Sequence, residues 1–132
     1  MNSETPIKKI VNTHVVFVLP TDTMQRVEDI FATMHIHHVL VLENEALVGV
    51  ISKSDLLNVY TETANERKVV DREKIIAAEL MTPDPIVLDI DDTIGLAADI
   101  FLSNKIHSIP IVNGSKLAGI ITNHDLIKFA FQ

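Results

Sequence analysis

Residues Leu47-Val48-Gly49-Val50-Ile51-Ser52-Lys53-Ser54-Asp55-Leu56 recur as Leu117-Ala118-Gly119-Ile120-Ile121-Thr122-Asn123-His124-Asp125-Leu126. Each stretch is a short apolar run that reaches a Ser or Thr, with an Asp three residues later. This order predicts a strand followed at once by a helix whose first turn holds a hydroxyl and a carboxylate. The unpaired backbone N–H groups of a helix start attract anions. The two stretches therefore predict two equivalent candidate ligand sites.

This recurrence belongs to a repeat that covers most of the 132-residue chain. Gly49 aligns with Gly119 and Asp55 with Asp125, a constant offset of 70 residues without a gap. The same offset aligns further identical pairs, which include Asp22/Asp92, Thr23/Thr93, Asp29/Asp99, Ile30/Ile100, Phe31/Phe101, Ile36/Ile106 and His37/His107. Two copies of one supersecondary unit are the simplest interpretation. Each copy is predicted to fold as β-α-β-β-α over about sixty residues, which is small for a stable unit, so the two copies are expected to pack together.

Local patterns predict the elements of each copy. Apolar runs at 15–19 and 86–88 predict first strands that are covered on both faces. Asp22 and Asp92 are expected to be the N-caps of the helices that follow. Apolar segments at 39–51 and 109–121 predict hairpins, and Pro110 is expected at an edge strand or a strand start because it has no N–H. Short amphipathic segments at 6–11 and 76–81 lead into the two copies, so we expect one domain at 1–66 and another at 67–132.

The composition is that of a globular protein with an aliphatic core: 47% of the residues are hydrophobic, and there is no Trp. The net charge of -7 argues against binding to a nucleic-acid backbone, which needs clustered Lys and Arg. The chain has no cysteine, which excludes disulfides and fits a reducing compartment. No segment has the roughly 18 apolar residues of a membrane span, and the polar N-terminal residues have no signal-like apolar run. We expect a cytoplasmic protein that does not insert into a membrane.

The tandem unit resembles the CBS domain, named for cystathionine β-synthase, because of two motifs. Gly-x-x-Ser/Thr-x-x-Asp follows the last strand of each copy, and the His-x-x-Pro motif at 107–110 enters the middle strand of the second. The pair resembles a Bateman module over nearly the whole chain. The resemblance implies an α+β fold in which two tandem β-α-β-β-α repeats pack about a pseudo-twofold axis. In that family, clefts between the repeats commonly hold adenine nucleotides or S-adenosylmethionine. It also implies a stand-alone regulatory module without catalytic activity, which forms a homodimer and signals to an enzyme or transporter in trans.

The resemblance also implies roles for individual residues. Asp55 and Asp125 match aspartates that accept hydrogen bonds from ribose hydroxyls, and Ser52 and Thr122 match hydroxyls near ribose or phosphate. His107 is in register with the phosphate-facing histidine of the γ subunit of AMP-activated protein kinase. The full expected ligand-binding set is Thr13, His14, His37, His38, Ser52, Ser54, Asp55, Thr82, Pro85, Ile86, His107, Ile109, Pro110, Thr122, His124 and Asp125. AMP, ADP or ATP is the expected regulatory ligand, and no other cofactor is required.

Two departures from the family pattern bear on affinity. Ser108 stands where strong nucleotide binders of the family have an Arg, and Leu40 stands in the first copy where the second has Pro110. Without a guanidinium group, bidentate phosphate contacts are lost. We therefore expect modest affinity, and the sequence leaves open which of the two clefts is used.

Alternative interpretations remain for these residues. Ser52 with Asp55, and Thr122 with Asp125, are also good helix-capping pairs, which need no ligand. The histidines at 35, 37 and 38 have no carboxylate at a diagnostic spacing, so no metal site is expected. Nothing resembles a nucleophile elbow or an oriented base, so no catalytic residue is expected. A ligand-free interaction or dimerisation module and an S-adenosylmethionine binder are the alternative functions.

Overall fold

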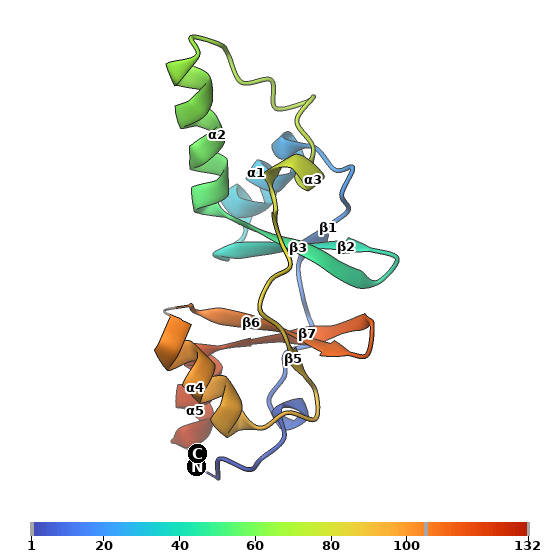
Figure 1. The fold of residues 1–132 in the computed structure, drawn as a ribbon, viewed down its shortest axis with the longest axis vertical. Helices are drawn as coiled ribbons and strands as arrows, with labels where there is room; N and C mark the ends of the chain where they lie inside the picture. Colours follow the sequence, from blue (N-terminus) through green and yellow to red (C-terminus); the bar gives the residue numbers. More distant parts are fainter. Residues whose placement is uncertain (1, 105, 132) are drawn as a thin grey trace. The chain divides into compact units, whose positions relative to one another are not determined.

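The computed structural model describes residues 2–104 and 106–131, which form two compact units. We call Val16–Pro85 the continuous unit, and Met1–Val15 together with Ile86–Gln132 the split unit. In each unit, the helices lie on one side of a small sheet (Figure 1). The α+β class and the tandem repeat that the sequence predicted are confirmed.

The continuous unit contains a four-stranded sheet in the order β1-β2-β3-β4. Its strands are β1 (Phe17–Val18), β2 (His38–Glu43), β3 (Ala46–Ser52) and β4 (Thr82–Pro83), and its helices are α1 (Met24–Thr33), α2 (Lys53–Asn65) and α3 (Ala77–Leu80). The β2–β3 hairpin turns at Asn44 and Glu45, which both have positive φ. The core of this unit is aliphatic and is formed by Val18, Met24, Val27, Ile30, Val39, Val41, Ile51, Leu56, Ala77 and Leu80.

The split unit contains a three-stranded sheet in the order β5-β6-β7. Its elements are the 3-10 helix η1 (Ile7–Lys9), β5 (Leu88–Asp89), α4 (Ile94–Asn104), β6 (Ser108–Asn113), β7 (Lys116–Thr122) and α5 (Asn123–Ala130). The β6–β7 turn uses Gly114 at φ 64, as the Asn-Gly pair predicted. The buried core residues are Ile7, Leu88, Ile94, Ala97, Phe101, Ile109, Ile111, Ile121 and Leu126.

The segments that lead into the two copies are exchanged between the units. Ile7 N–H donates to the Asp92 carbonyl at 2.8 Å, and the equivalent Ala77 N–H donates to the Asp22 carbonyl at 2.7 Å. Each segment therefore packs on the copy that it does not precede. The division at 1–66 and 67–132 follows the order of the sequence, whereas the compact units divide after residues 15 and 85.

Glycines of the last strands make room for the exchanged segments. A Cβ atom at Gly119 would lie 2.4 Å from the Asn12 carbonyl oxygen and 2.7 Å from Val11 Cγ2. A Cβ atom at Gly49 would lie 2.4 Å from Met81 Sδ. Backbone hydrogen bonds join Asn12 and Ile120 in both directions at 3.0 Å. The glycine of the repeated motif is thus required by the close approach of a neighbouring segment.

The predictions for the first strands and for the helix N-caps were wrong. The first strands are only two residues long, and Phe17 is exposed rather than covered. The N-cap of α1 is Thr23, whose Oγ accepts from Arg26 N–H, whereas the Asp22 carboxylate accepts from Leu19 N–H at 2.7 Å. Asp92 accepts from Asp89 N–H in the same way. An Asp one residue before the cap satisfies the turn that enters the helix rather than the helix itself.

Pro110 lies in the middle of β6, which is the central strand of its sheet, and not at an edge. The equivalent Leu40 N–H donates to the Val16 carbonyl at 3.3 Å, a bond that proline cannot make. The pairing of β5 with β6 accordingly starts at Leu88 and Ile111, beyond the proline. The central strand tolerates Pro110 because the neighbouring strand begins after it.

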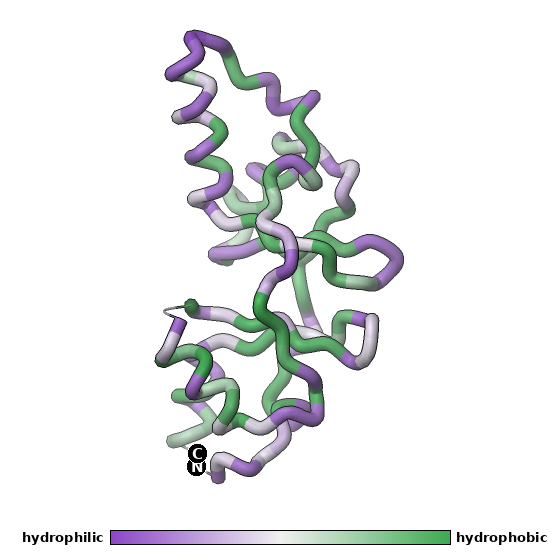
Figure 2. The backbone as a smooth tube through the Cα atoms, in the orientation of Figure 1, coloured by the Kyte–Doolittle hydropathy of each residue, from purple (hydrophilic) through white to green (hydrophobic). Residues whose placement is uncertain are grey.

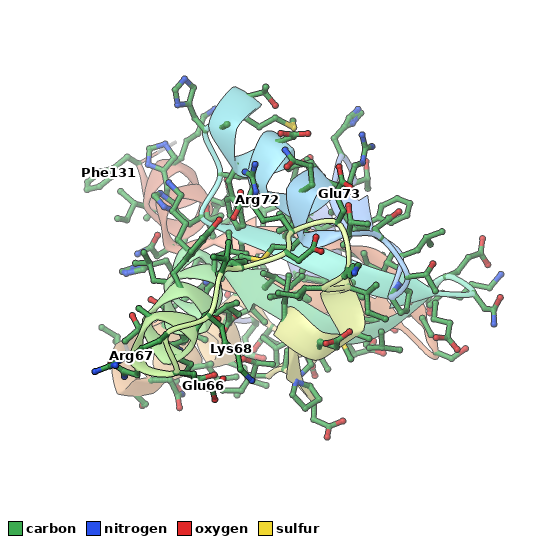
Figure 3. The ribbon with its side chains drawn as sticks, turned by 90° about the horizontal axis from the view of Figure 1, so that it is seen from above. Glu66, Arg67, Lys68, Arg72, Glu73 and Phe131 are labelled. Atoms are coloured by element: carbon green, nitrogen blue, oxygen red, sulfur yellow. The ribbon has the colours of Figure 1, made fainter. Side chains whose placement is uncertain are left out.

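The polar connector between α2 and α3 is tied to the continuous unit by a small network. Figure 2 shows this connector as mostly hydrophilic, in contrast to the strands. Arg72, which Figure 3 labels on the connector, donates to Glu28 Oε2 at 2.8 Å, and the Tyr60 hydroxyl donates to Glu28 Oε1. The hydrogen bond to Glu28 raises the pKa of Tyr60 above its ordinary value. The connector is therefore anchored just before the exchanged segment begins.

Candidate functional site

The first candidate site lies where β3 ends and α2 begins. Ser52 is the N-cap, and its Oγ accepts a hydrogen bond from Asp55 N–H at 3.2 Å. The Asp55 carboxylate returns the interaction by accepting from Ser52 N–H through Oδ2 at 2.7 Å. This reciprocal arrangement is a capping box with Asp in place of the more common Glu. It fixes both polar side chains, which are partly buried, at the helix start.

The second candidate site repeats this geometry in the split unit. Thr122 Oγ1 accepts from Asp125 N–H at 3.1 Å, and Asp125 Oδ2 accepts from Thr122 N–H at 2.8 Å. The capping interpretation of both motifs is therefore confirmed. In each capping box, only one of the two carboxylate oxygens of the Asp accepts a capping hydrogen bond.

The second carboxylate oxygen distinguishes the two sites. Asp55 Oδ1 accepts a hydrogen bond from Thr82 Oγ1 at 3.4 Å, so the structure brings together three predicted residues, Ser52, Asp55 and Thr82. No further bond to Asp125 is found among residues 2–104 and 106–131. Carboxylate oxygens with spare acceptor capacity can bind hydroxyl groups of a ligand.

The predicted histidines lie in different surroundings. His107 is exposed, and its Nδ1 lies 3.3 Å from Asn123 Nδ2, while Asn123 N–H donates to the His107 carbonyl at 3.1 Å. His37 is exposed in the loop before β2, and His38 is partly buried in β2. Asn123 was not in the predicted set. Its position directly after the N-cap Thr122 was the available signal that its amide could contact His107.

The remaining predicted residues are accessible to different degrees. Thr13, His14, Ser54, Thr82, Ile86 and His124 are exposed, and Pro85 is partly buried. Ile109 and Pro110 are buried, and Ile109 is 0% exposed, so its side chain belongs to the core of the split unit. The role of Ile109 as a ligand contact stays a prediction, and the motif that contains it runs directly into β6.

Lys53 is a cation at the first candidate site that the prediction omitted. It follows the N-cap, and its Nζ lies 6.0 Å from the centre of the Phe31 ring. The equivalent residue of the second site is the uncharged Asn123. A lysine in the first turn adds positive charge where the helix dipole already favours anions.

Other site types find no support in the part of the chain that the structure describes. Within residues 2–104 and 106–131, no three His, Asp or Glu side chains are grouped so as to hold a metal ion. No described helix combines the length and the apolar character of a membrane span. A surface hollow beside the connector is lined by Gln25 and residues 69–73, and none of the predicted ligand-binding residues lines it.

Comparison with known proteins adds to this geometry. The sequence profile of the CBS domain matches residues 7–62 and 77–131, one match for each copy. The chain belongs to the CBS domain family. It is a tandem pair of CBS domains, the arrangement that regulatory proteins of this family use, and the recognition that its motifs suggested is confirmed.

Several relatives and solved structures resemble the pair. CBSX2 from Arabidopsis thaliana, solved in complex with AMP, superimposes with a TM-score of 0.80 at 25% identity and 97% coverage of each chain. The CBS domain of a membrane protein from Sphaerobacter thermophilus gives a TM-score of 0.74 at 27% identity, covering 96% of this chain and 88% of that one. The arabinose 5-phosphate isomerase KdsD of Francisella tularensis is 28% identical over 117 residues, which are 87% of this chain and 34% of that enzyme.

The chain thus spans about a third of the length of that isomerase, and 22% of an inosine-5'-monophosphate dehydrogenase from Methanocaldococcus jannaschii that it also matches. In these two enzymes, the matched region is one part of a longer protein. The similarity therefore concerns only that part of each enzyme.

Proposed function

We propose that the chain is a regulatory module that senses an adenine nucleotide, AMP, ADP or ATP, at the starts of α2 and α5. The observation that carries the proposal is the AMP complex of CBSX2, which resembles this chain over nearly its full length. The paired capping boxes support it, because each holds a carboxylate at a fixed position with one oxygen outside the box. In this proposal the module has no catalytic role.

The chemistry of the helix starts suits a nucleotide. A ribose hydroxyl donates to the oxygen of Asp55 or Asp125 that the box does not use. The first-turn N–H groups that have no carbonyl partner inside the helix, together with His107 or Lys53, favour a phosphate group. No Arg lies in these first turns, so the expected affinity is modest.

Signalling follows from differential binding. A nucleotide favours one conformation of the module only to the extent that it binds that conformation more tightly. A partner that contacts the module then responds to nucleotide concentration. We propose that this partner is an enzyme or transporter in the cytoplasm that is regulated in trans.

A thermal-shift assay with AMP, ADP, ATP and S-adenosylmethionine tests this function. A ligand at about 100 times its dissociation constant adds roughly 2.7 kcal/mol to the free energy of unfolding, which is a clear shift in melting temperature. The control carries Asp55→Asn and Asp125→Asn together. Asn keeps an oxygen for the capping bond but replaces the other oxygen with an NH₂ group, which cannot accept from ribose.

A shift with AMP, ADP or ATP that is lost in the double variant supports the proposal. A shift with S-adenosylmethionine alone supports the alternative ligand. If no compound shifts the melting of the folded protein, the nucleotide proposal is wrong and the ligand-free interaction module is favoured.

The interaction module is the second candidate, and exposed apolar side chains favour it. Leu96 and Leu102 on α4 are 42% and 83% exposed, while Ile127 and Phe131 on and after α5 are 55% and 86% exposed. Phe131 projects away from the ribbon in Figure 3. The positions equivalent to 96, 102 and 131 in the first copy are Arg26, Ala32 and Thr61, so the fold itself does not require large apolar side chains there. Leu57, which is equivalent to Ile127, is itself 64% exposed.

Exposed apolar groups of this kind are typical of association surfaces. We accordingly propose a homodimer that buries this surface, and light scattering after gel filtration measures it. Leu102→Glu should convert a dimer into a monomer, whereas Ser103→Glu, which adds the same charge one residue away, should retain the dimer. A wild-type monomer at micromolar concentration contradicts this proposal.

A further inference from the structure

The two candidate sites have the same capping box but differ at the carboxylate oxygen that lies outside it. In the continuous unit, Thr82 Oγ1 donates to Asp55 Oδ1. In the split unit, the described residues make no equivalent bond to Asp125. This oxygen is the one that the proposed nucleotide site needs as an acceptor for ribose.

The difference follows from a single substitution between equivalent positions. Thr82 pairs with Val50 across the sheet, and Asn12 pairs with Ile120 in the same register of the split unit. The Asn12 side chain turns to its own loop, where its Oδ1 accepts from His14 N–H at 3.0 Å. Asn12 is thus the equivalent of Thr82, but its side chain bonds within its own loop and makes no bond to Asp125 among the described residues.

A second difference is that His107 has additional contacts beside Asp125. His107 is joined to Asn123 at the start of α5 by a backbone hydrogen bond of 3.1 Å and by the contact between their side chains. At the equivalent position of the first copy, the Lys53 ammonium lies over the Phe31 ring and has no such bond to His37 among the described residues. A side chain that is already held in place loses less entropy when a ligand binds.

We propose that Thr82 occupies the ligand acceptor of Asp55, so that the two sites fill in order, Asp125 first and Asp55 second. The inference rests on the proposed nucleotide function and deepens it. A ribose hydroxyl competes with Thr82 for Asp55 Oδ1, whereas it meets Asp125 with an acceptor oxygen that no described residue uses. The net contribution of one such hydrogen bond corresponds to about a two- to tenfold difference in affinity.

Calorimetric titration of AMP into single-site variants tests this order. Asp55→Asn leaves the Asp125 site intact, and Asp125→Asn leaves the Asp55 site intact, while both keep their caps. We expect AMP to bind the Asp55→Asn variant about two- to tenfold more tightly than the Asp125→Asn variant. Adding Thr82→Val to Asp125→Asn should raise its affinity by a similar factor, because valine has the shape of threonine without the hydroxyl.

Thr82→Val in the Asp55→Asn background is the matched control and should change nothing. Equal affinities of the two single-site variants, or a Thr82→Val substitution that leaves or lowers the affinity of the Asp55 site, overturn the inference and leave nucleotide binding intact. The latter result makes Thr82 a direct ligand contact. Absence of AMP binding to the wild-type protein overturns the proposed function, and this inference with it.

Discussion

Substitution of Gly119 by alanine tests the exchange of the lead-in segments. A Cβ atom there would lie 2.4 Å from the Asn12 carbonyl oxygen, 2.7 Å from Val11 Cγ2 and 3.1 Å from the Asn12 carbonyl carbon. Two of these three atoms are backbone atoms, so rotating a side chain cannot remove the clash. The segment that contains Val11 and Asn12 has to move away from β7.

The size of the effect follows from the contacts that this movement breaks. Two hydrogen bonds of 3.0 Å between Asn12 and Ile120 are lost, at about 1 kcal/mol each. Overpacking against Val11 adds about 1–2 kcal/mol, and the lower backbone entropy of unfolded alanine offsets about 0.5–1 kcal/mol. We expect Gly119→Ala to lower the free energy of unfolding by about 2–3.5 kcal/mol.

Urea unfolding followed by circular dichroism measures this change. Gly49→Ala is the informative comparison, because its nearest neighbours are Met81 side-chain atoms, which can move in part. It should cost less than Gly119→Ala, and adding Met81→Ala should reduce its cost further. If Gly119→Ala stays within about 0.5 kcal/mol of the wild type, the usual range for a harmless substitution, the N-terminal segment does not pack on β7 as described.

Three further predictions concern the caps, the connector and the hydroxyl of Thr82. Ser52→Ala and Thr122→Ala should each lower the free energy of unfolding by about 1 kcal/mol, since each removes an N-cap acceptor. Urea titration measures the loss, and an unchanged free energy of unfolding contradicts the capping boxes. Tyr60 is the single tyrosine of the chain, so ultraviolet titration reports it directly, and its midpoint should lie above the ordinary value of 10.0 because its hydroxyl donates to Glu28. Glu28→Gln should lower the titration midpoint of Tyr60. Because the pKa of Tyr60 is higher in the folded than in the unfolded protein, its hydrogen bond stabilises the protein below pH 10 and is lost as the pH rises through the folded pKa. A wild-type midpoint at or below 10.0 contradicts the bond. Thr82→Val alone should lower the free energy of unfolding by about 0.5–1 kcal/mol, the low end for one hydrogen bond, because its bond to Asp55 is long and exposed. A loss above about 1.5 kcal/mol in the same urea assay makes Thr82 a structural residue.

The repeated fold could be predicted from the sequence because the patterns that indicate it are local. The offset between Gly49 and Gly119 identified two copies, and Asn113-Gly114 identified a hairpin turn. The start of each closing helix was placed correctly, since Ser52 and Thr122 follow an apolar strand and precede an Asp at capping distance. Such patterns are decided within a few residues of one another.

The exchange of the lead-in segments could not be predicted, for a physical reason. Ile7 and Ala77 occupy equivalent positions, and the carbonyl groups of Asp92 and Asp22 that accept from them are equivalent as well. The backbone donor of each segment would find an equivalent acceptor on either copy. Local sequence patterns therefore do not distinguish the two arrangements.

The candidate site was predicted in part. The roles of Ser52, Asp55, Thr122 and Asp125 as capping residues follow from spacing and are confirmed, while their roles as ligand contacts stay predictions. The contact between Thr82 and Asp55 joins residues far apart in the sequence, and it depends on which segment is exchanged onto β3. Ile109 was predicted both as a strand residue and as a ligand contact, because the same motif marks the loop and the first residues of a central strand.

The most direct test of the central claim is a titration of the ¹⁵N-labelled protein with AMP, followed by amide chemical shifts. We expect saturable shifts at the amides of residues 52–55 and 122–125, and we expect those of 122–125 to change at lower AMP concentration. Saturable shifts that are confined to other residues, or no shift at millimolar AMP, would contradict this expectation.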